Sequence, residues 1–313
     1  METAVTDVHV VCPDVQAAID WYSDEGGLRI DTIYPADAPR EAELSAKGLR
    51  LRLTASNSRP AAVSEPSLVI TRLDENAFGI GRAGMQYRDL IPGRFGGRFI
   101  ASHIRIPTGG PVPDYVHHHD VEFQMIFCVN GWVRVAYEDQ GEPMRMVAGD
   151  CFLQPPHIRH RVLECSDNME VVEITCPAEH ETAVDHAMTL PTSTIDTART
   201  FGGQQFVFHE NTKAPWLDSD VKGARCQDLG LAAATDGVVS AIVIRVDDEG
   251  GSLTLRHAGE LRFIYVMKGS AELTGGDAGR LVAGDAVAAP AGCDVTIDNL
   301  SAGFMALEVD VPS

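Results

Sequence analysis

Three histidines in the middle of the chain are of the residue type that most often binds transition metals. His117 and His119 occupy alternate positions in VHHHDVEFQMIFCVNG, and His160 ends the later segment GDCFLQPPHIRH. Alternation along a β-strand puts His117 and His119 on one face and turns His118 to the other. Because imidazoles from two neighbouring strands can converge on one ion, we expect the functional site here.

The elements that must position these histidines are expected to be short β-strands. From Ser67 onward, runs such as GRFIASHIRI, FQMIFCV and WVRVAYE are separated by turns rich in Gly, Pro and Asp. This pattern is typical of an all-β barrel or sandwich. After Cys176 the alternation is lost until about residue 200, which predicts an irregular connecting arm.

The strand pattern then starts again, and the two halves of the chain repeat each other. FQMIFCVNGWVRV aligns with RFIYVMKGSAEL, and MVAGDCFLQPPHIRH aligns with LVAGDAVAAPAGCDV, in the same order. Matching strings in matching order predict a duplicated domain.

The first 55 residues have a different pattern, with a strand over residues 5–12, a helix capped by Asp14 and three further strands. This βαβββ order, with HVVCPDVQAAIDWY near its start, resembles half of a glyoxalase/bleomycin-resistance (vicinal oxygen chelate) module. His9 lies where that family often places a ligand, but no partner ligands follow. We expect an ordinary strand histidine in a structural or dimer-forming segment.

The histidine region resembles the cupin superfamily, and the repeat indicates a bicupin. The resemblance implies jelly-roll barrels, with His117, His119 and His160 as metal ligands. Gln124 stands where the family has a glutamate, and it is either a fourth ligand or a neighbour that hydrogen-bonds a bound water or substrate.

The second copy has kept the turn residues of the motif but not its ligands. The ligand positions hold Leu255, His257, Arg262 and Val295, so this barrel is expected to be degenerate and without metal. We therefore predict a mainly β protein: a small α+β segment (1–66) ending in a linker, a metal-binding cupin barrel (67–190) and a degenerate barrel (191–313).

Three neutral imidazoles leave two or three positions of a divalent ion open, which is typical of a catalytic site. Imidazole suits Fe(II), the metal we expect, and also zinc, nickel or manganese. A glutamine in place of a glutamate leaves the site at a formal charge of +2, which favours an anionic, chelating substrate.

The predicted function follows from a similarity to three-histidine cupin dioxygenases. It implies an Fe(II) enzyme that uses molecular oxygen to cleave a small anionic, vicinally oxygenated substrate, for example an aromatic one. The same ligands would serve a redox-neutral isomerase, lyase or hydrolase, or a non-catalytic small-molecule sensor.

Other residues flanking the motif are candidates for substrate binding and proton transfer. Arginines on predicted strands are candidates to hold a substrate carboxylate, and two further histidines are candidates for acid–base roles. The arginines are Arg98, Arg105 and Arg134, and the histidines are His103 and His157.

Composition limits the partners. A formal net charge of -20 argues against nucleic acid or an anionic membrane, both of which attract basic surfaces. The seven cysteines are scattered, and no apolar run is long enough to span a bilayer. We expect a cytoplasmic homodimer with reduced, mostly buried thiols.

Overall fold

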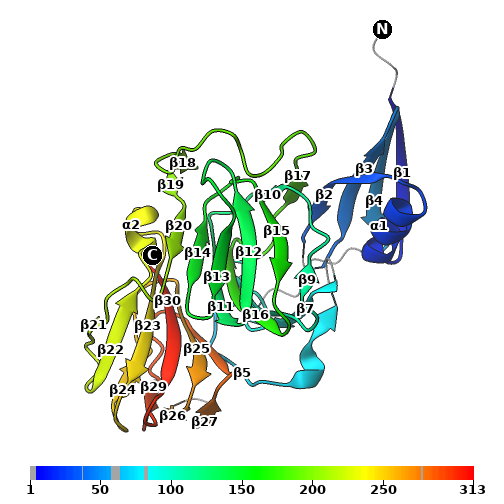
Figure 1. Ribbon diagram of the computed structural model, residues 1–313. Coiled ribbons are helices and arrows are strands. Elements are labelled where there is room, and N and C mark those ends of the chain that lie inside the picture. The colour runs from blue at the N-terminus through cyan, green and yellow to red at the C-terminus, as the bar shows by residue number, and fades with distance from the viewer. Residues whose placement is uncertain (1–4, 37, 58–63, 81–83, 276–277) are drawn as a thin grey trace.

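A computed structural model describes residues 5–36, 38–57, 64–80, 84–275 and 278–313. The N-terminal segment lies on one side of a first β-barrel, and a second barrel lies on the other side (Figure 1). The predicted fold, mainly β with a βαβββ segment followed by two barrels, is confirmed.

The N-terminal segment packs one helix on a four-stranded part of a sheet. Helix α1 (Val15–Asp24) begins where predicted, since Asp14 accepts a hydrogen bond from the backbone N–H of Ala17 at 3.0 Å. Its buried residues Val15 and Ile19 join the core of the segment. His9 lies on a strand, with Nε2 2.8 Å from Oγ1 of Thr54. The strands are β1 (Thr6–Cys12), β2 (Arg29–Tyr34), β3 (Glu41–Ala46) and β4 (Leu49–Ala55).

This sheet continues into the first barrel. Its order is β1-β4-β3-β2-β17-β10-β15-β12-β13, and β9 pairs with β15. The prediction of an irregular arm after Cys176 was wrong at β17, because Thr182 pairs with Ile33 and Ala183 pairs with His118. The barrel strands of this sheet are β9 (Gly110–Pro111), β10 (His117–His119), β12 (Trp132–Tyr137), β13 (Met144–Val147), β15 (His160–Cys165) and β17 (Thr182–Val184).

The other sheet of the first barrel has the order β20-β14-β11-β16-β8-β7-β6. Along β11, Gln124 and Ile126 point into the barrel, whereas Phe123, Met125 and Phe127 point to the second barrel. Both faces of β11 are thus covered, which explains its continuous apolar run. The elements are η1 (Glu75–Ala77), β6 (Gly79–Ile80), β7 (Gln86–Asp89), β8 (Ile100–Ile106), β11 (Phe123–Asn130), β14 (Cys151–Gln154), β16 (Met169–Cys176) and β20 (Val207–His209).

The second barrel has two sheets of its own, in the orders β21-β22-β23-β30-β25-β28-β5 and β24-β29-β26-β27. The first sheet contains β5 (Val69–Thr71), β21 (Leu217–Asp218), β22 (Ala224–Asp228), β23 (Ser240–Val246), β25 (Leu261–Lys268), β28 (Ala286–Ala289) and β30 (Met305–Val311). The second contains β24 (Ser252–Thr254), β26 (Ser270–Thr274), β27 (Gly279–Val282) and β29 (Thr296–Asp298). Two further elements belong to neither sheet: a separate hairpin of β18 (Thr200–Phe201) and β19 (Gln204–Gln205), and helix α2 (Leu231–Ala234).

The two barrels share a core and exchange strands. Phe127 of the first barrel and Phe263 of the second belong to one buried apolar cluster. Strand β5 precedes the first barrel in sequence but pairs with β28 of the second, and β20 follows the first barrel but pairs with its β14. The division into 1–66, 67–190 and 191–313 stays a proposal, and these two strands cross it. Part of the predicted linker, residues 58–63, lies outside the described residues.

No helix in the described part of the chain is long and apolar enough to cross a membrane. All seven cysteines are free, and five of them are buried. Burial raises the pKa of the Cys128 and Cys176 thiols to about 12, so these side chains pack as small apolar groups.

Candidate metal centre and its cavity

His117, His119 and His160 lie together inside the first barrel. Strand β10 pairs with β15 at His117 and His160, and alternation turns His119 to the same side as His117. All three side chains are buried, and their candidate ligand atoms lie within 4.8 Å of one another. The cluster is therefore able to hold a divalent metal.

Each of these imidazoles is oriented through its Nδ1 atom. Nδ1 of His117 lies 2.8 Å from the carbonyl oxygen of Tyr115, and Nδ1 of His160 lies 3.0 Å from that of Ile158. Nδ1 of His119 lies 2.8 Å from Oγ1 of Thr182, on the unexpected strand β17. A carbonyl oxygen only accepts, so Nδ1 of His117 and His160 carries the proton and Nε2 carries the lone pair that a metal needs.

Two amide side chains and a tyrosine lie against the histidines. Nε2 of Gln154 donates to Oε1 of Gln124 at 2.9 Å and lies 3.2 Å from Nε2 of His160. The Tyr137 hydroxyl donates to Oε1 of Gln154 at 2.7 Å, and burial holds its pKa well above the usual range. The proton of Tyr137 thus fixes the orientation of Gln154, which in turn orients Gln124. A metal bound to His160 would take the place of the Gln154 contact.

The cluster opens onto a cavity of about 620 Å³, including its open mouth. The histidines and the two glutamines lie at its polar end, and apolar residues from both sheets of the barrel form most of its wall. A second, smaller hollow shares His119 and Gln124 with this cavity and is also lined by Ala36 of the N-terminal segment and by His180. The polar end of the cavity therefore borders two hollows.

Glu173 lines both hollows and was not predicted as a site residue. It lies on β16 opposite Ile126, two residue pairs from the pair of Gln124 and Thr175. Glu173 and Val171 are two residues apart, so their side chains lie on the same face of β16. The sequence alone does not tell which face is the inner one, because that depends on the pairing of β16 with β11.

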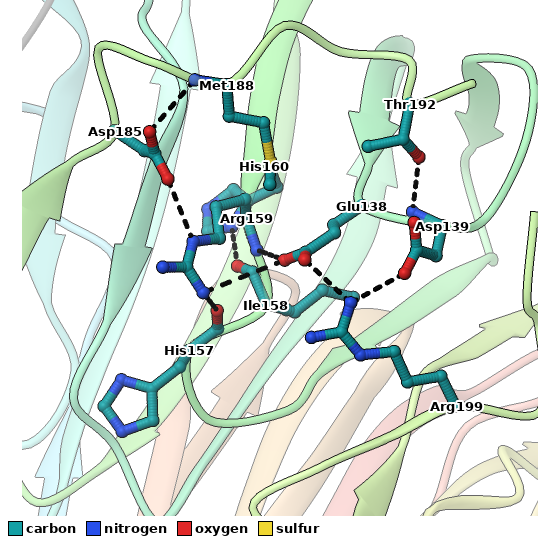
Figure 2. Close-up of polar contacts among 10 residues, drawn as sticks. All are labelled: Glu138, Asp139, His157, Ile158, Arg159, His160, Asp185, Met188, Thr192 and Arg199. Atoms are coloured by element: carbon teal, nitrogen blue, oxygen red, sulfur yellow. Dashed lines mark hydrogen bonds and ion pairs between the residues drawn. The ribbon is translucent and has the colours of Figure 1, made fainter. Parts of the chain in front are cut away.

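The turn that delivers His160 is tied to the arm between the barrels (Figure 2). Arg159 places Nε 3.3 Å from a carboxylate oxygen of Asp185, and Asp185 accepts the backbone N–H of Met188 at 3.0 Å. Arg199 donates from Nη1 to the buried Glu138 at 2.8 Å. This network holds the arm against the edge of the barrel beside the histidines.

The structure does not bring the predicted acid–base histidines into the cavity. His103 lies on β8 between Ser102 and Ile104, which face inward, and so it points toward the second barrel. Its Nε2 lies 2.7 Å from Oε2 of Glu170. His157 is half exposed in a turn with a φ of 62°, and its Nε2 lies 3.4 Å from Asp120.

The predicted arginines also lie outside the cavity, each paired with a carboxylate. Arg105 contacts Glu75 at 2.6 Å, and Arg134 contacts Glu164 at 2.9 Å on the outer face of the barrel. Arg98 joins Glu122 of the first barrel to Glu260 of the second. None of the three is placed to hold a substrate next to the histidines.

In the second barrel, mostly other residue types stand where the first barrel has its candidate metal ligands. Leu255 and Val295 are buried in its apolar core, and Nε2 of His257 donates to the carbonyl of Ala289 at 2.9 Å. Arg262, at the position of Gln124, forms two hydrogen bonds with Asp310 at 2.7 and 2.8 Å. Glu308 corresponds to Glu173 of the first barrel. Glu173 pairs with Ile126, two residues after Gln124, and Glu308 pairs with Ile264, two residues after Arg262.

We predict that Glu308 makes stability depend on pH. Burial raises its pKa from 4.5 to about 7, so between these values the folded chain holds a proton that the unfolded chain has lost. The free energy of unfolding should fall as pH rises through this window, and the loss should remain above it. The free energy of unfolding would be measured in urea at about pH 5 and about pH 8. Between these pH values wild type should lose about 2 kcal/mol more than Glu308→Gln. The control Glu249→Gln, at an exposed loop residue, should lose as much as wild type. Parallel pH curves for wild type and Glu308→Gln would contradict the prediction.

A second prediction concerns Gln124. In Gln124→Glu, a carboxylate replaces the amide beside the histidines while the hydrogen bond from Gln154 can be kept. We expect the affinity for a divalent metal, measured by competition with a chelator, to rise about tenfold through the added charge. An unchanged affinity would mean that the charge of the side chain at position 124 does not affect metal binding.

Comparison with known proteins agrees with this geometry. A family model described as a cupin domain matches residues 102–175, which include all three histidines. The two barrels complete the assignment. The chain is a bicupin in fold. No curated protein matches the sequence.

Solved structures similar to this bicupin have low sequence identity to it. A glyoxylate-induced protein from Pseudomonas aeruginosa has 14% identity and a TM-score of 0.57, over 82% of this chain and 92% of the other. A variant of oxalate decarboxylase from Bacillus subtilis has 11% identity and a TM-score of 0.57, over 81% and 80%. Salicylate 1,2-dioxygenase from Pseudaminobacter salicylatoxidans has 13% identity and a TM-score of 0.55, over 71% and 75%. At these identities the similarity establishes the fold.

Proposed function

We propose that this bicupin is an Fe(II)-dependent dioxygenase that oxidatively cleaves a small substrate bearing two neighbouring oxygen atoms. The observation that carries the proposal is a buried cluster of three imidazoles opening onto a largely apolar cavity. A three-histidine set leaves room on the ion for substrate and dioxygen. The fold similarity to salicylate 1,2-dioxygenase supports this choice of reaction.

In this proposal His117, His119 and His160 hold the ion through Nε2. Bound iron would supply open coordination positions and one-electron chemistry toward dioxygen. The chain itself fixes the imidazoles through the Nδ1 contacts of Tyr115 and Ile158, and its apolar wall excludes water from the reacting atoms. Gln124 would act beside the ion, with its amide oriented by Gln154.

The alternative is a redox-neutral isomerase, lyase or hydrolase that uses zinc, nickel or manganese as a Lewis acid. Glu173 favours this alternative, because a carboxylate in the cavity suits reactions that move a proton. The fold similarity to oxalate decarboxylase is in line with it as well.

One experiment separates the two functions. Metal content would be measured on the freshly purified protein, and oxygen uptake would be followed on the same sample with compounds that carry two neighbouring oxygens. The dioxygenase proposal expects iron and substrate-dependent oxygen uptake. Full turnover under strict anoxia would overturn it and favour the redox-neutral enzyme.

We also propose a cytoplasmic location and a homodimer. The free cysteines, five of them buried, suit a reducing compartment. Light scattering coupled to size-exclusion chromatography would test the dimer directly, since a monomer mass at micromolar concentration would contradict it.

A further inference from the structure

The contact that orients His119 comes from a distant part of the chain. Nδ1 of His117 and Nδ1 of His160 each lie against a carbonyl oxygen two residues before them. Nδ1 of His119 instead lies 2.8 Å from Oγ1 of Thr182, which is 63 residues away in sequence. The placement of Thr182 therefore bears on the direction in which His119 presents its Nε2 atom.

Thr182 is held in place by the strands on either side of it. Its backbone pairs with His119 of β10 and with Ile33 of β2, and its side chain is completely buried. Threonine branches at Cβ, so packing on both sides restricts the rotation of its hydroxyl group about χ1. When Nδ1 of His119 carries a proton, the hydroxyl oxygen accepts the hydrogen bond and Nε2 keeps its lone pair. Thr182 is thus suited to orient this imidazole for metal binding.

The N-terminal segment supplies one of these two neighbours, and its side chains reinforce the contact. Before β17, Glu179 accepts two hydrogen bonds from Arg40, at 2.7 and 2.6 Å. The two side chains are 23% and 15% exposed, and a bidentate arginine–carboxylate pair fixes geometry as well as charge. After β17, Nε2 of His186 donates to the carbonyl oxygen of Ile30 at 2.8 Å. The chain is therefore attached to the segment on both sides of Thr182.

We propose that the N-terminal segment is a functional part of the metal centre: it holds β17 so that Thr182 stays against His119, and Thr182 acts as the positioning residue of this ligand. The inference rests on the proposed metal-dependent function and adds to it a role for the N-terminal segment. The segment then contributes to metal affinity without supplying a ligand.

The first test changes the hydroxyl. The affinity of the full chain for Co(II) would be measured by competition with a chelator, and the visible absorption spectrum of bound Co(II) would report its ligand geometry. Thr182→Val keeps the shape but removes the hydroxyl, so the affinity should fall at least about tenfold and the spectrum should change. Thr182→Ser keeps the hydroxyl and should bind within about threefold of wild type.

The second test loosens the N-terminal segment. Glu179→Gln weakens the pair with Arg40 and should lower the Co(II) affinity at least about threefold. The matched control is Glu41→Gln, which affects an exposed pair with Arg52 in the same segment and should leave the affinity unchanged. Adding Glu179→Gln to Thr182→Val should cost at most about twofold more than Thr182→Val alone, because both changes act through one hydroxyl.

Three outcomes would overturn the inference: wild-type affinity in Thr182→Val, equal losses in Thr182→Val and Thr182→Ser, or equal affinities of Glu179→Gln and Glu41→Gln. Fully additive losses in the double variant would overturn it as well. Thermal unfolding would show which variants fold, and if Thr182→Val does not, the comparison of Glu179→Gln with Glu41→Gln decides. Wild type that binds no divalent metal would instead count against the proposed function, so the two failures are distinguishable.

Discussion

Replacing His119 with alanine is expected to lower the affinity for a divalent metal by more than about 100-fold, whereas replacing its neighbour His118 should leave the affinity nearly unchanged. Loss of a direct ligand should cost more than loss of an outer partner, which typically costs 10–100-fold. The two residues are adjacent on β10 but point to opposite sides. His119 faces the other two imidazoles, whereas His118 faces His157.

The measurement is metal content after dialysis, together with chelator competition, on wild type and both variants. Circular dichroism and thermal unfolding would show whether each variant is folded. His118 is half-buried, and burial lowers its pKa, so His118→Ala also controls for removing an imidazole from a strand. Equal loss of metal in both variants would mean that strand disruption, rather than ligation, explains the effect. Retained affinity in His119→Ala would exclude His119 from the site.

The sequence predicted the histidine cluster because alternation is a local property of a strand. Spacing alone put His117 and His119 on one face, and the resemblance to the cupin superfamily added His160 as the third ligand. The same reasoning could not choose a face for His103 or Arg105, because β8 is covered on both sides and its burial does not alternate. His103 contacts Tyr265 of the second barrel, and Arg105 pairs with Glu75 and Gln86, so their direction depends on contacts outside β8.

The remaining site residues depend on how strands pair. Glu173 comes next to Gln124 only through the register of β16 with β11, and Gln154 does so through the register of β14 with β11. A shift of one residue in either register would turn the side chain to the other face. Strand β17 is a stronger case, since its three residues carry little strand signal. They form a strand because β2 and β10 offer open edges on both sides.

Pairing through β17 gives the N-terminal segment a direct connection to the metal centre. Thr182 pairs with Ile33 on one side and with His119 on the other, and its hydroxyl contacts the same imidazole. Ala36, just after β2, lines the smaller hollow. The segment that the sequence suggested as a structural or dimer-forming unit thus supports the strand that carries two of the histidines, and forms part of the wall.

Arg88 is expected to be the side chain whose loss most weakens the contact between the barrels. It is 1% exposed and lies on β7 of the first barrel. Its Nη2 donates to the carbonyl of Gly284 in the second barrel at 2.6 Å and lies 3.2 Å from Nδ1 of His103. Burial lowers the pKa of Arg88, so the surroundings compensate only part of the cost of its charge.

Arg88→Ala should lower the free energy of unfolding by about 3 kcal/mol, because it leaves buried acceptors without their donor and opens a cavity between the barrels. Urea unfolding would measure the change. Arg134→Ala is the matched control: that side chain is 46% exposed and pairs with Glu164 at the surface, so its loss should cost at most about 0.5 kcal/mol. A similar small loss for both variants would show that the barrels are held together by their shared apolar core alone, without a measurable contribution from this buried arginine.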